Sequence, residues 1–147
     1  MEDLGRERIH GRPTKLFPLT EWAWEEPGET RRFTLLIAAS AFVDDAPLIR
    51  RFAVDAVAAG CVWGEDCERV EELFDQASIA ADRFVMSTCH RESLADALYF
   101  ALVDSILEDV SATESATILA VEPPWLAEVR RLVADQDELA RLWGAEE

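Results

Sequence analysis

Residues 60–90 predict a strand, a helix and a second strand in succession, and they read GCVWGEDCERVEELFDQASIAADRFVMSTCH. Residues 61–63 form a short apolar strand, and residues 67–81 carry apolar side chains at helical spacing behind Asp66, a predicted N-cap. Residues 83–88 form the second strand. Strand, helix and strand in this order are typical of a parallel sheet, because parallel neighbours need a long crossover.

Strands and helices also alternate on both sides of this unit. Residues 32–40, RFTLLIAAS, are almost continuously apolar, which is the pattern of a strand buried on both faces of a sheet. The other expected elements are a helix over 44–60, a helix over 93–109, a strand over 117–121 and a last helix that begins at Pro123.

These elements predict an α/β fold, a single small three-layer domain over residues 33–147 with a four-stranded, mainly parallel sheet. The expected strand order is 2-1-3-4, because the third strand must return beside the first if helices are to cover both faces. Residues 1–32 contain Pro13, Pro18 and Pro27 and show no sustained periodicity. We therefore expect an irregular N-terminal arm before the domain.

The net charge of −16 on 147 residues argues against a nucleic-acid partner, because binding to phosphates requires Lys and Arg side chains. The longest uninterrupted apolar run, residues 97–103, is far too short to cross a bilayer, and the charged start lacks the apolar core of a signal peptide. We expect a cytoplasmic protein without a membrane partner. In a reducing compartment its three cysteines are expected to remain thiols.

Ligands bind open parallel sheets outside the carboxyl ends of the strands, so the residues that follow each predicted strand are candidates for binding a ligand or a partner. These residues are acidic and aromatic in this chain. In the alternative, structural interpretation the Asp residues cap helices and the Trp residues cover the sheet edge. The candidates are Asp44, Asp45, Trp63, Glu65, Asp66, Glu122 and Trp125.

Cys67, Cys89 and His90 are the candidate catalytic residues, because a thiol and an imidazole often act together in nucleophilic catalysis. Cys67 is expected at a helix N-terminus, whose dipole favours a thiolate, but the carboxylates around it oppose that charge. Adjacent side chains on an extended chain point to opposite faces. A dyad would therefore pair His90 with Cys67.

Metal and nucleotide cofactors are not expected. The three cysteines and His90 have the right ligand types for zinc, but their spacing matches no familiar zinc pattern. The carboxylates that follow the first two strands would suit Mg²⁺ beside a bound phosphate, yet the chain has no Gly-rich phosphate loop. An edge rich in carboxylates is better suited to a cation or a basic protein surface.

Residues 60–100 contain two motifs, Gly64-Glu65-Asp66-Cys67-Glu68 and Val85-Met86-Ser87-Thr88-x-His90-x-Glu92-Ser93-Leu94. Through these motifs the chain resembles an uncharacterised family of small bacterial, Rossmann-like α/β domains. Where the relatives have an aromatic residue, typically Trp, before the His, this chain has Cys89. The resemblance implies a bacterial origin and a Rossmann-like fold, and it implies no activity.

We expect a non-enzymatic, acidic protein-interaction module, an immunity-type or regulatory subunit of a bacterial system with a basic protein partner. The alternative is a small enzyme with a Cys/His site or a carboxylate-bound metal at the carboxyl edge of the sheet. The third helix is apolar round most of its circumference. It and the last helix are therefore expected to bind a partner, a second copy of the chain or the N-terminal arm.

Overall fold

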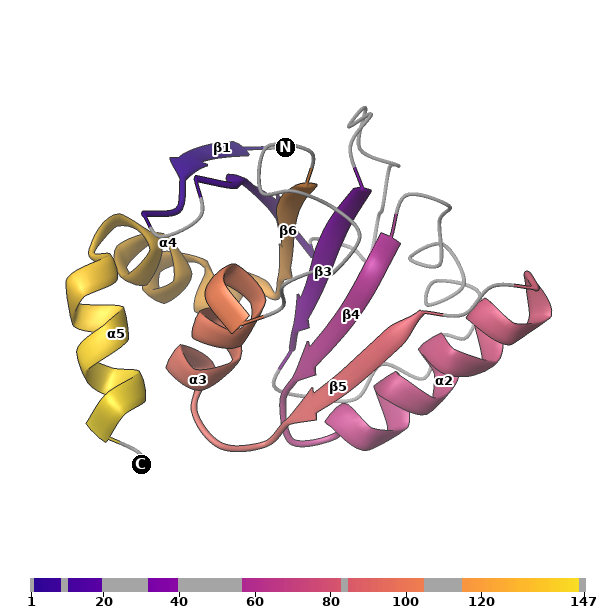
Figure 1. Cartoon of the computed structure of the whole chain (residues 1–147). Helices are drawn as coiled ribbons and strands as arrows, with labels where there is room; N and C mark the ends of the chain where they lie inside the picture. The colour runs from indigo at the N-terminus through magenta and orange to yellow at the C-terminus, as the bar shows by residue number, and fades with distance from the viewer. Residues whose placement is uncertain are drawn as a thin grey trace.

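A six-stranded sheet forms the centre of the computed structural model, which describes residues 2–8, 11–19, 32–39, 57–82, 85–104 and 115–145 (Figure 1). The strand order is β1-β2-β6-β3-β4-β5, and every neighbouring pair is parallel except the antiparallel β1–β2 pair. The strands are β1 (Glu2–Arg6), β2 (Pro13–Pro18), β3 (Arg32–Ala38), β4 (Val57–Trp63), β5 (Met86–His90) and β6 (Ser115–Val121).

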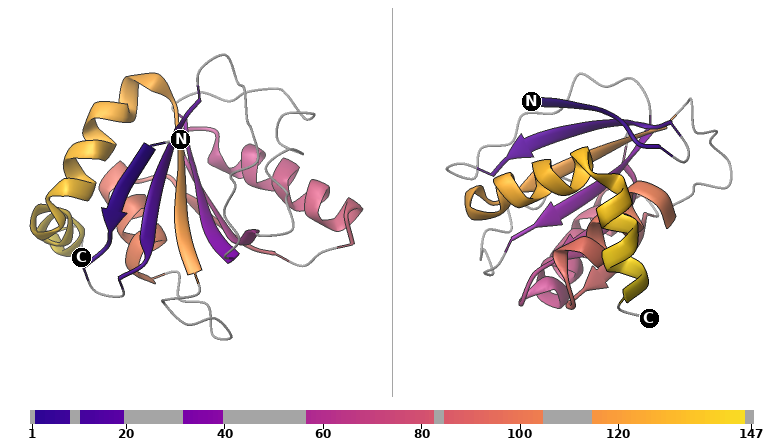
Figure 2. Two further views of the ribbon diagram at one scale, coloured as in Figure 1. Left: turned by 90° about the horizontal axis from the view of Figure 1, so that it is seen from above. Right: turned by 90° about the vertical axis from the view of Figure 1, so that its left-hand side faces the viewer.

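Helices cover both faces of the sheet (Figure 2). They are α2 (Cys67–Ala80), α3 (Leu94–Tyr99), the π-helical turn η1 (Phe100–Asp104), the 3-10 turn η3 (Pro123–Trp125), α4 (Leu126–Ala134) and α5 (Gln136–Ala145). α2 packs on one face, and α3, α4 and α5 pack on the other. None of the helices in the described ranges is long and apolar enough to span a membrane.

Strand β3 is buried on both faces, because successive side chains of a strand point to opposite sides of the sheet. Leu35 and Ile37 join the core beneath α2, whereas Leu36 and Ala38 join the core beneath α3, α4 and α5. The side chains of β6 alternate between the same two cores. The nearly continuous apolar sequence of β3 therefore reflects packing on both sides, as predicted.

The predicted strand order 2-1-3-4 and the predicted number of strands are wrong. β5, the third predicted strand, lies beside β4 at the edge of the sheet, and β6, the fourth, lies beside β3. All seven residues of β6 are buried, whereas β5 is largely polar and only half-buried or exposed. A polar strand is tolerated at a sheet edge, where one side faces water, so burial decides which strand is central.

The N-terminal arm is not irregular where the structure describes it. Residues 2–6 and 13–18 form β1 and β2, and β2 pairs in parallel with β6. Pro13 and Pro18 are the first and last residues of β2, so they bound the strand without interrupting it. Gly11, with a φ of +70°, helps to turn the chain between the two strands.

Two predicted helices also differ from the structure. Of the helix expected over 44–60, residues 57–60 belong to β4, and the rest lies outside the described residues. The third helix is covered within the same chain, because Tyr99 of α3 stacks on Trp143 of α5 with ring centroids 4.4 Å apart. The last helix thus occupies one side of the third helix that we expected to be free. Binding of a second copy through these helices stays a prediction.

Candidate functional site

Four parallel strands end together at one edge of the sheet. Trp63 of β4 pairs with Ala38 of β3 and with His90 of β5, and Ala38 pairs with Val121 of β6. The segments that leave these strand ends therefore converge at the carboxyl edge, where open parallel sheets bind their ligands. The described candidate residues lie at this edge or in the turns that leave it.

Trp63 and Trp125 cover the carboxyl edge between β4 and η3. Their rings meet edge to face, with centroids 5.0 Å apart and planes at 81°. The indole N–H of Trp63 donates to the backbone carbonyl of Glu92 at 3.5 Å. Both rings are half-buried, which agrees with the structural interpretation in which Trp residues shield the sheet edge.

Cys67 and Cys89 form a disulfide, so the prediction that they remain thiols is wrong. Cys67 is the first residue of α2, Cys89 precedes the last residue of β5, and their Cα atoms are 5.6 Å apart. Cys89 packs on the α2 face because it alternates with its neighbours along the strand. Sequence reasoning missed the pair because a whole helix separates the two thiols in the chain.

His90 points to the face of β5 opposite the disulfide, where it forms two hydrogen bonds. Its Nε2 lies 2.9 Å from Thr88 Oγ1, and its Nδ1 lies 3.4 Å from Asp96 Oδ2. With the imidazole hydrogen on Nδ1, that nitrogen donates to Asp96, and Nε2 accepts the Thr88 hydroxyl. The ring also packs against Phe100, with centroids 4.8 Å apart. These contacts hold the imidazole in one orientation.

Cys61 is a free, buried thiol within β4, in register with Thr88 of β5. Burial raises the pKa of Cys61 to about 11, although a hydrogen bond with Thr88 and the charge of Arg12 lower it in part. A thiol that keeps its proton is a poor nucleophile. Cys61 therefore acts as a small core side chain.

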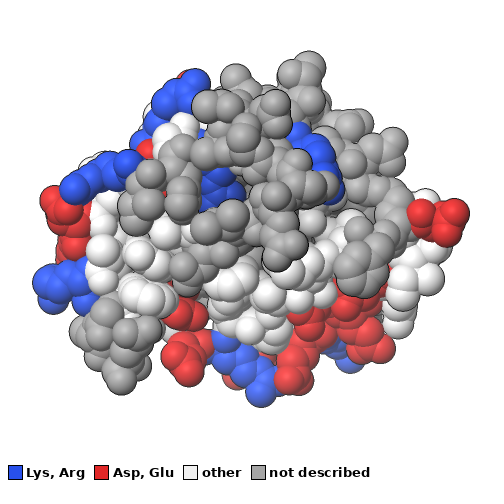
Figure 3. All heavy atoms as spheres, in the orientation of Figure 1, with Lys and Arg blue, Asp and Glu red and all other residues white. Residues whose placement is uncertain are grey.

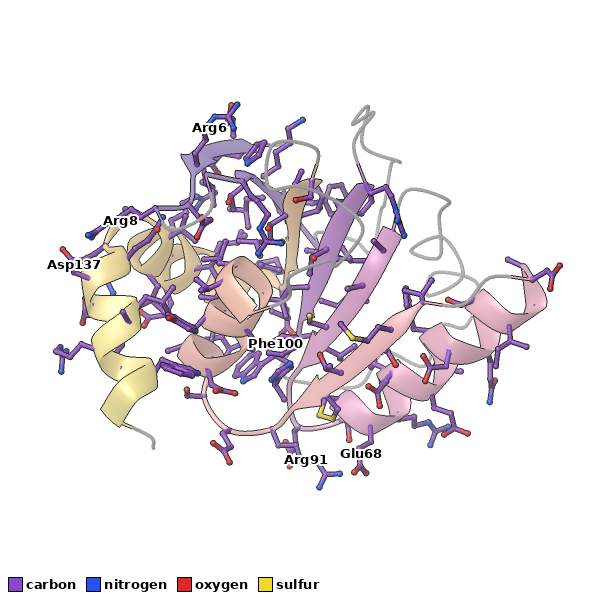
Figure 4. The ribbon with its side chains drawn as sticks, viewed as in Figure 1. Arg6, Arg8, Glu68, Arg91, Phe100 and Asp137 are labelled. Carbon is purple, nitrogen blue, oxygen red and sulfur yellow. A yellow bond between two sulfur atoms is a disulfide. The ribbon has the colours of Figure 1, made fainter. Side chains whose placement is uncertain are left out.

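An open hollow of about 520 Å³ lies beside the end of β5, and we call it the edge hollow. It is lined by Glu68, Cys89, His90, Arg91, Glu92 and Asp96. Arg91 is already paired with Glu68, and Figure 4 shows these two side chains pointing toward one another. Three carboxylates against one paired guanidinium make the edge hollow suitable for a cationic group.

The remaining candidates lie outside the edge hollow. Glu65 and Asp66 are exposed in the turn between β4 and α2, and Glu122 is half-buried directly after β6. Asp66 occupies the N-cap position of α2, but its side chain makes no capping hydrogen bond. Asp44 and Asp45 lie outside the described residues. Within the ranges described, no three His, Cys, Asp or Glu side chains are grouped closely enough to hold a metal ion.

Sequence reasoning missed Asp96, which contacts His90. Ser93 is the N-cap of α3, and its Oγ accepts a hydrogen bond from the Asp96 N–H at 3.0 Å. This capping signal could have placed Asp96 in the first helical turn, close to the strand end that carries His90. Glu68 lies in α2 and Arg91 directly follows β5, and no sequence signal joins them.

The fold and the site define a mixed α/β domain with a mostly parallel sheet and an acidic hollow bordered by a disulfide at its carboxyl edge. Residues 12–136 match a family described as a domain of unknown function, DUF7684, and the chain belongs to this family. No curated protein and no solved structure shows a significant match to the chain. The family match extends well beyond residues 60–100 and agrees with the expectation of an uncharacterised family.

Proposed function

We propose that this domain is an acidic protein-interaction module that binds a basic side chain of a partner protein in the edge hollow. The proposal rests on the charge of the edge hollow. Its walls combine three carboxylates with one guanidinium, that of Arg91, which is already paired with Glu68. A Lys or Arg side chain of the partner would meet the carboxylates of Glu92 and Asp96 there.

The surface beside the edge hollow supports the same kind of partner. Residues 65–82, which comprise the turn before α2, α2 itself and the turn after it, contain seven acidic residues and one basic residue. Figure 3 shows acidic side chains gathered at the lower right, where α2 lies in Figure 1. A field of one sign around a hollow raises the local concentration of an oppositely charged partner and its association rate.

We further propose that the protein is a bacterial, cytoplasmic, Rossmann-like domain that serves as an immunity-type or regulatory subunit. The motifs within residues 60–100 support the bacterial and Rossmann-like assignments. The parallel pairing of β3, β4, β5 and β6, with helices on both faces, is compatible with a Rossmann-like fold.

The alternative of a small enzyme with a nucleophilic cysteine is less well supported. Cys67 and Cys89 are bonded to each other, so neither sulfur is a free nucleophile in this structure. Both ring nitrogens of His90 already have hydrogen-bonding partners. The carboxylate-bound metal would need Asp44 and Asp45, which lie outside the described residues.

Calorimetric titration with a short Arg-Gly repeat peptide tests the proposal, with a Glu-Gly repeat peptide for comparison. The basic peptide should bind and the acidic peptide should not. Glu92→Gln should weaken binding of the basic peptide up to about fivefold, because a partly exposed charge pair contributes up to about 1 kcal/mol.

Glu72→Gln is the matched control, because Glu72 is an exposed acidic residue of α2 outside the edge hollow. It should change the dissociation constant by less than about twofold, since a distant exposed charge is screened by salt. Equal weakening by both variants would contradict the edge hollow as the binding site. Equal binding of the two peptides would contradict the charge preference.

A further inference from the structure

We propose that the Cys67–Cys89 disulfide is a site of thiol–disulfide exchange whose substrate is a dithiol carried by a basic protein segment. The basic character of the substrate and the cytoplasmic setting rest on the proposed function, whereas the geometry of the exchange does not. Cys89 is half-buried and forms part of the wall of the edge hollow, so the disulfide lies beside an open hollow.

The two sulfur atoms differ in access. Cys67 is 1% exposed and packs in the core beneath α2, whereas Cys89 is half-buried and lines the edge hollow. β5 is the last strand of the sheet, and no further strand among the described elements lies outside it. An incoming thiolate should therefore attack the sulfur of Cys89.

Cys67 is suited to be the leaving group of this attack. It is the first residue of the 14-residue helix α2, and a helix N-terminus stabilises a thiolate. Glu65, Asp66 and Glu68 surround the same helix end and oppose a lasting negative charge. The released thiolate should therefore be short-lived and take up one of the protons that the substrate thiols lose.

The exchange proceeds in two steps. A substrate thiolate first attacks the sulfur of Cys89, a substrate–Cys89 disulfide forms, and the Cys67–Cys89 bond breaks with its electron pair on Cys67. The second substrate thiolate then attacks the substrate sulfur of this mixed disulfide, and Cys89 leaves as a thiolate. Two electrons and two protons pass from the substrate to Cys67 and Cys89, and the substrate becomes a disulfide.

The second thiol must come from outside the chain. Cys61, the third cysteine of the chain, is buried in the core on the opposite face of the sheet from the Cys67–Cys89 bond. It therefore cannot resolve the mixed disulfide. A substrate that carries both thiols supplies the second one within the same complex, so the proposed substrate is a dithiol.

A purely structural disulfide is a poorer explanation of the bond. α2 already packs on the sheet through buried side chains that include Val70 and Phe74, and a chain of 147 residues can bury enough apolar surface without a covalent link. In the proposed cytoplasmic compartment, disulfides are rare and usually transient, catalytic or redox-sensing.

The exchange can be tested by counting thiols with mass spectrometry on the full chain, while circular dichroism confirms that the chain stays folded. A dithiol peptide flanked by Arg should reduce Cys67 and Cys89 together and leave Cys61 unmodified by a thiol reagent. The same peptide flanked by Glu should react about tenfold more slowly. Each rate is divided by the rate of the same peptide on hydroxyethyl disulfide, which corrects for the reactivity of its thiols.

Two single variants identify the attacked sulfur. In the Cys67→Ser variant, the remaining thiol of Cys89 should react with hydroxyethyl disulfide at least about tenfold faster than the thiol of Cys67 reacts in the Cys89→Ser variant. The reason is that only Cys89 lines the edge hollow. If either variant fails to fold, acid quenching of the wild-type reaction followed by peptide mapping should place the mixed disulfide on Cys89.

Each contrary result overturns a distinct part of the proposal. Reduction that occurs only after unfolding in denaturant would overturn the exchange and make the bond structural. A mixed disulfide on Cys67 would overturn the assigned direction of attack. Equal corrected rates for the two peptides would leave the exchange standing and overturn the basic substrate together with the proposed function.

Discussion

Gly60 is a position of β4 at which the packing leaves no room for a side chain. A Cβ atom on Gly60 would lie 2.8 Å from Cε1 of Phe74, closer than packed atoms approach. Phe74 is 1% exposed in the core beneath α2, so its ring cannot move aside freely. We expect Gly60→Ala to lower the free energy of unfolding by about 1–3 kcal/mol, the usual cost of overpacking, as measured by urea denaturation.

A second substitution supplies the control for this experiment. Phe74→Leu in the Gly60→Ala background removes the ring atoms that the new methyl group meets. The double variant should therefore lose less stability than the two single variants added together, because neighbouring substitutions couple. Strict additivity of the two losses would show that Gly60 is required for another reason.

Cys61 should make the stability of the fold depend on pH at the alkaline end. Burial raises the pKa of this thiol from 9.0 to about 11, so the unfolded chain releases the proton at a lower pH than the folded chain. The raised pKa contributes roughly 2–3 kcal/mol to the free energy of unfolding below pH 9, and this contribution is lost as the pH rises through 11. Urea denaturation of wild type and Cys61→Ala should show a steeper alkaline loss for wild type. Parallel pH profiles would contradict the raised pKa.

At the scale of elements, Arg12 connects the beginning of β2 to the π-helical turn η1. Its guanidinium donates to the carbonyl of Ala101 at 3.1 Å and to that of Leu102, and the residue is 3% exposed. Burial lowers the pKa of Arg12, whereas the nearby charge of Glu7 raises it. Glu7 is itself 2% exposed, so two buried charges of opposite sign hold the β1–β2 turn to the helical layer.

Removal of the Arg12 charge should therefore destabilise the whole domain. We expect Arg12→Ala to lower the free energy of unfolding by about 3–5 kcal/mol, because the buried Glu7 would lose the nearby charge of Arg12. Arg12→Lys should recover only part of the loss, because an ammonium group cannot reproduce the two directed hydrogen bonds of the guanidinium. Thermal unfolding measures both variants, and a loss below about 1 kcal/mol for Arg12→Ala would contradict the buried pair.

At the scale of the whole molecule, the charge is distributed unevenly. Residues 1–39 contain six basic and seven acidic side chains, whereas residues 65–82 contain one basic and seven acidic. β1 and β2 lie at one edge of the sheet, and α2 packs near the other, beside β4 and β5 (Figure 1). A basic partner should therefore approach the α2 side of the molecule first.

The association rate should show this steering. We expect the rate constant for binding of the Arg-Gly peptide to fall as salt is raised, since interactions between exposed charges are screened beyond about 8 Å at physiological ionic strength. Stopped-flow fluorescence measures the rate, and added sucrose at constant salt controls for viscosity. A rate independent of salt would mean that the net charge of −16 plays no part in recognition.

Elements with a strong local pattern were predicted close to their observed positions. The helix expected over 67–81 is α2, Cys67–Ala80, because its apolar side chains repeat with the helical period. β3 was also predicted nearly in full, since its side chains enter a core on each face. β1 and β2 were missed because they are short, and because Pro13 and Pro18 resemble breakers when their position at the strand ends is unknown.

By itself the sequence determined the alternation of strands and helices from β4 to α4, the acidic character and the carboxyl edge as the place of the unusual residues, because each depends on local pattern or composition. The tertiary structure alone decided that β6 is central and β5 is at the edge, that Cys67 meets Cys89, and that Asp96 contacts His90. These contacts join segments far apart in the chain or on different elements. Several strands could occupy the central positions of the sheet. The periodicity within one segment does not show which of them does.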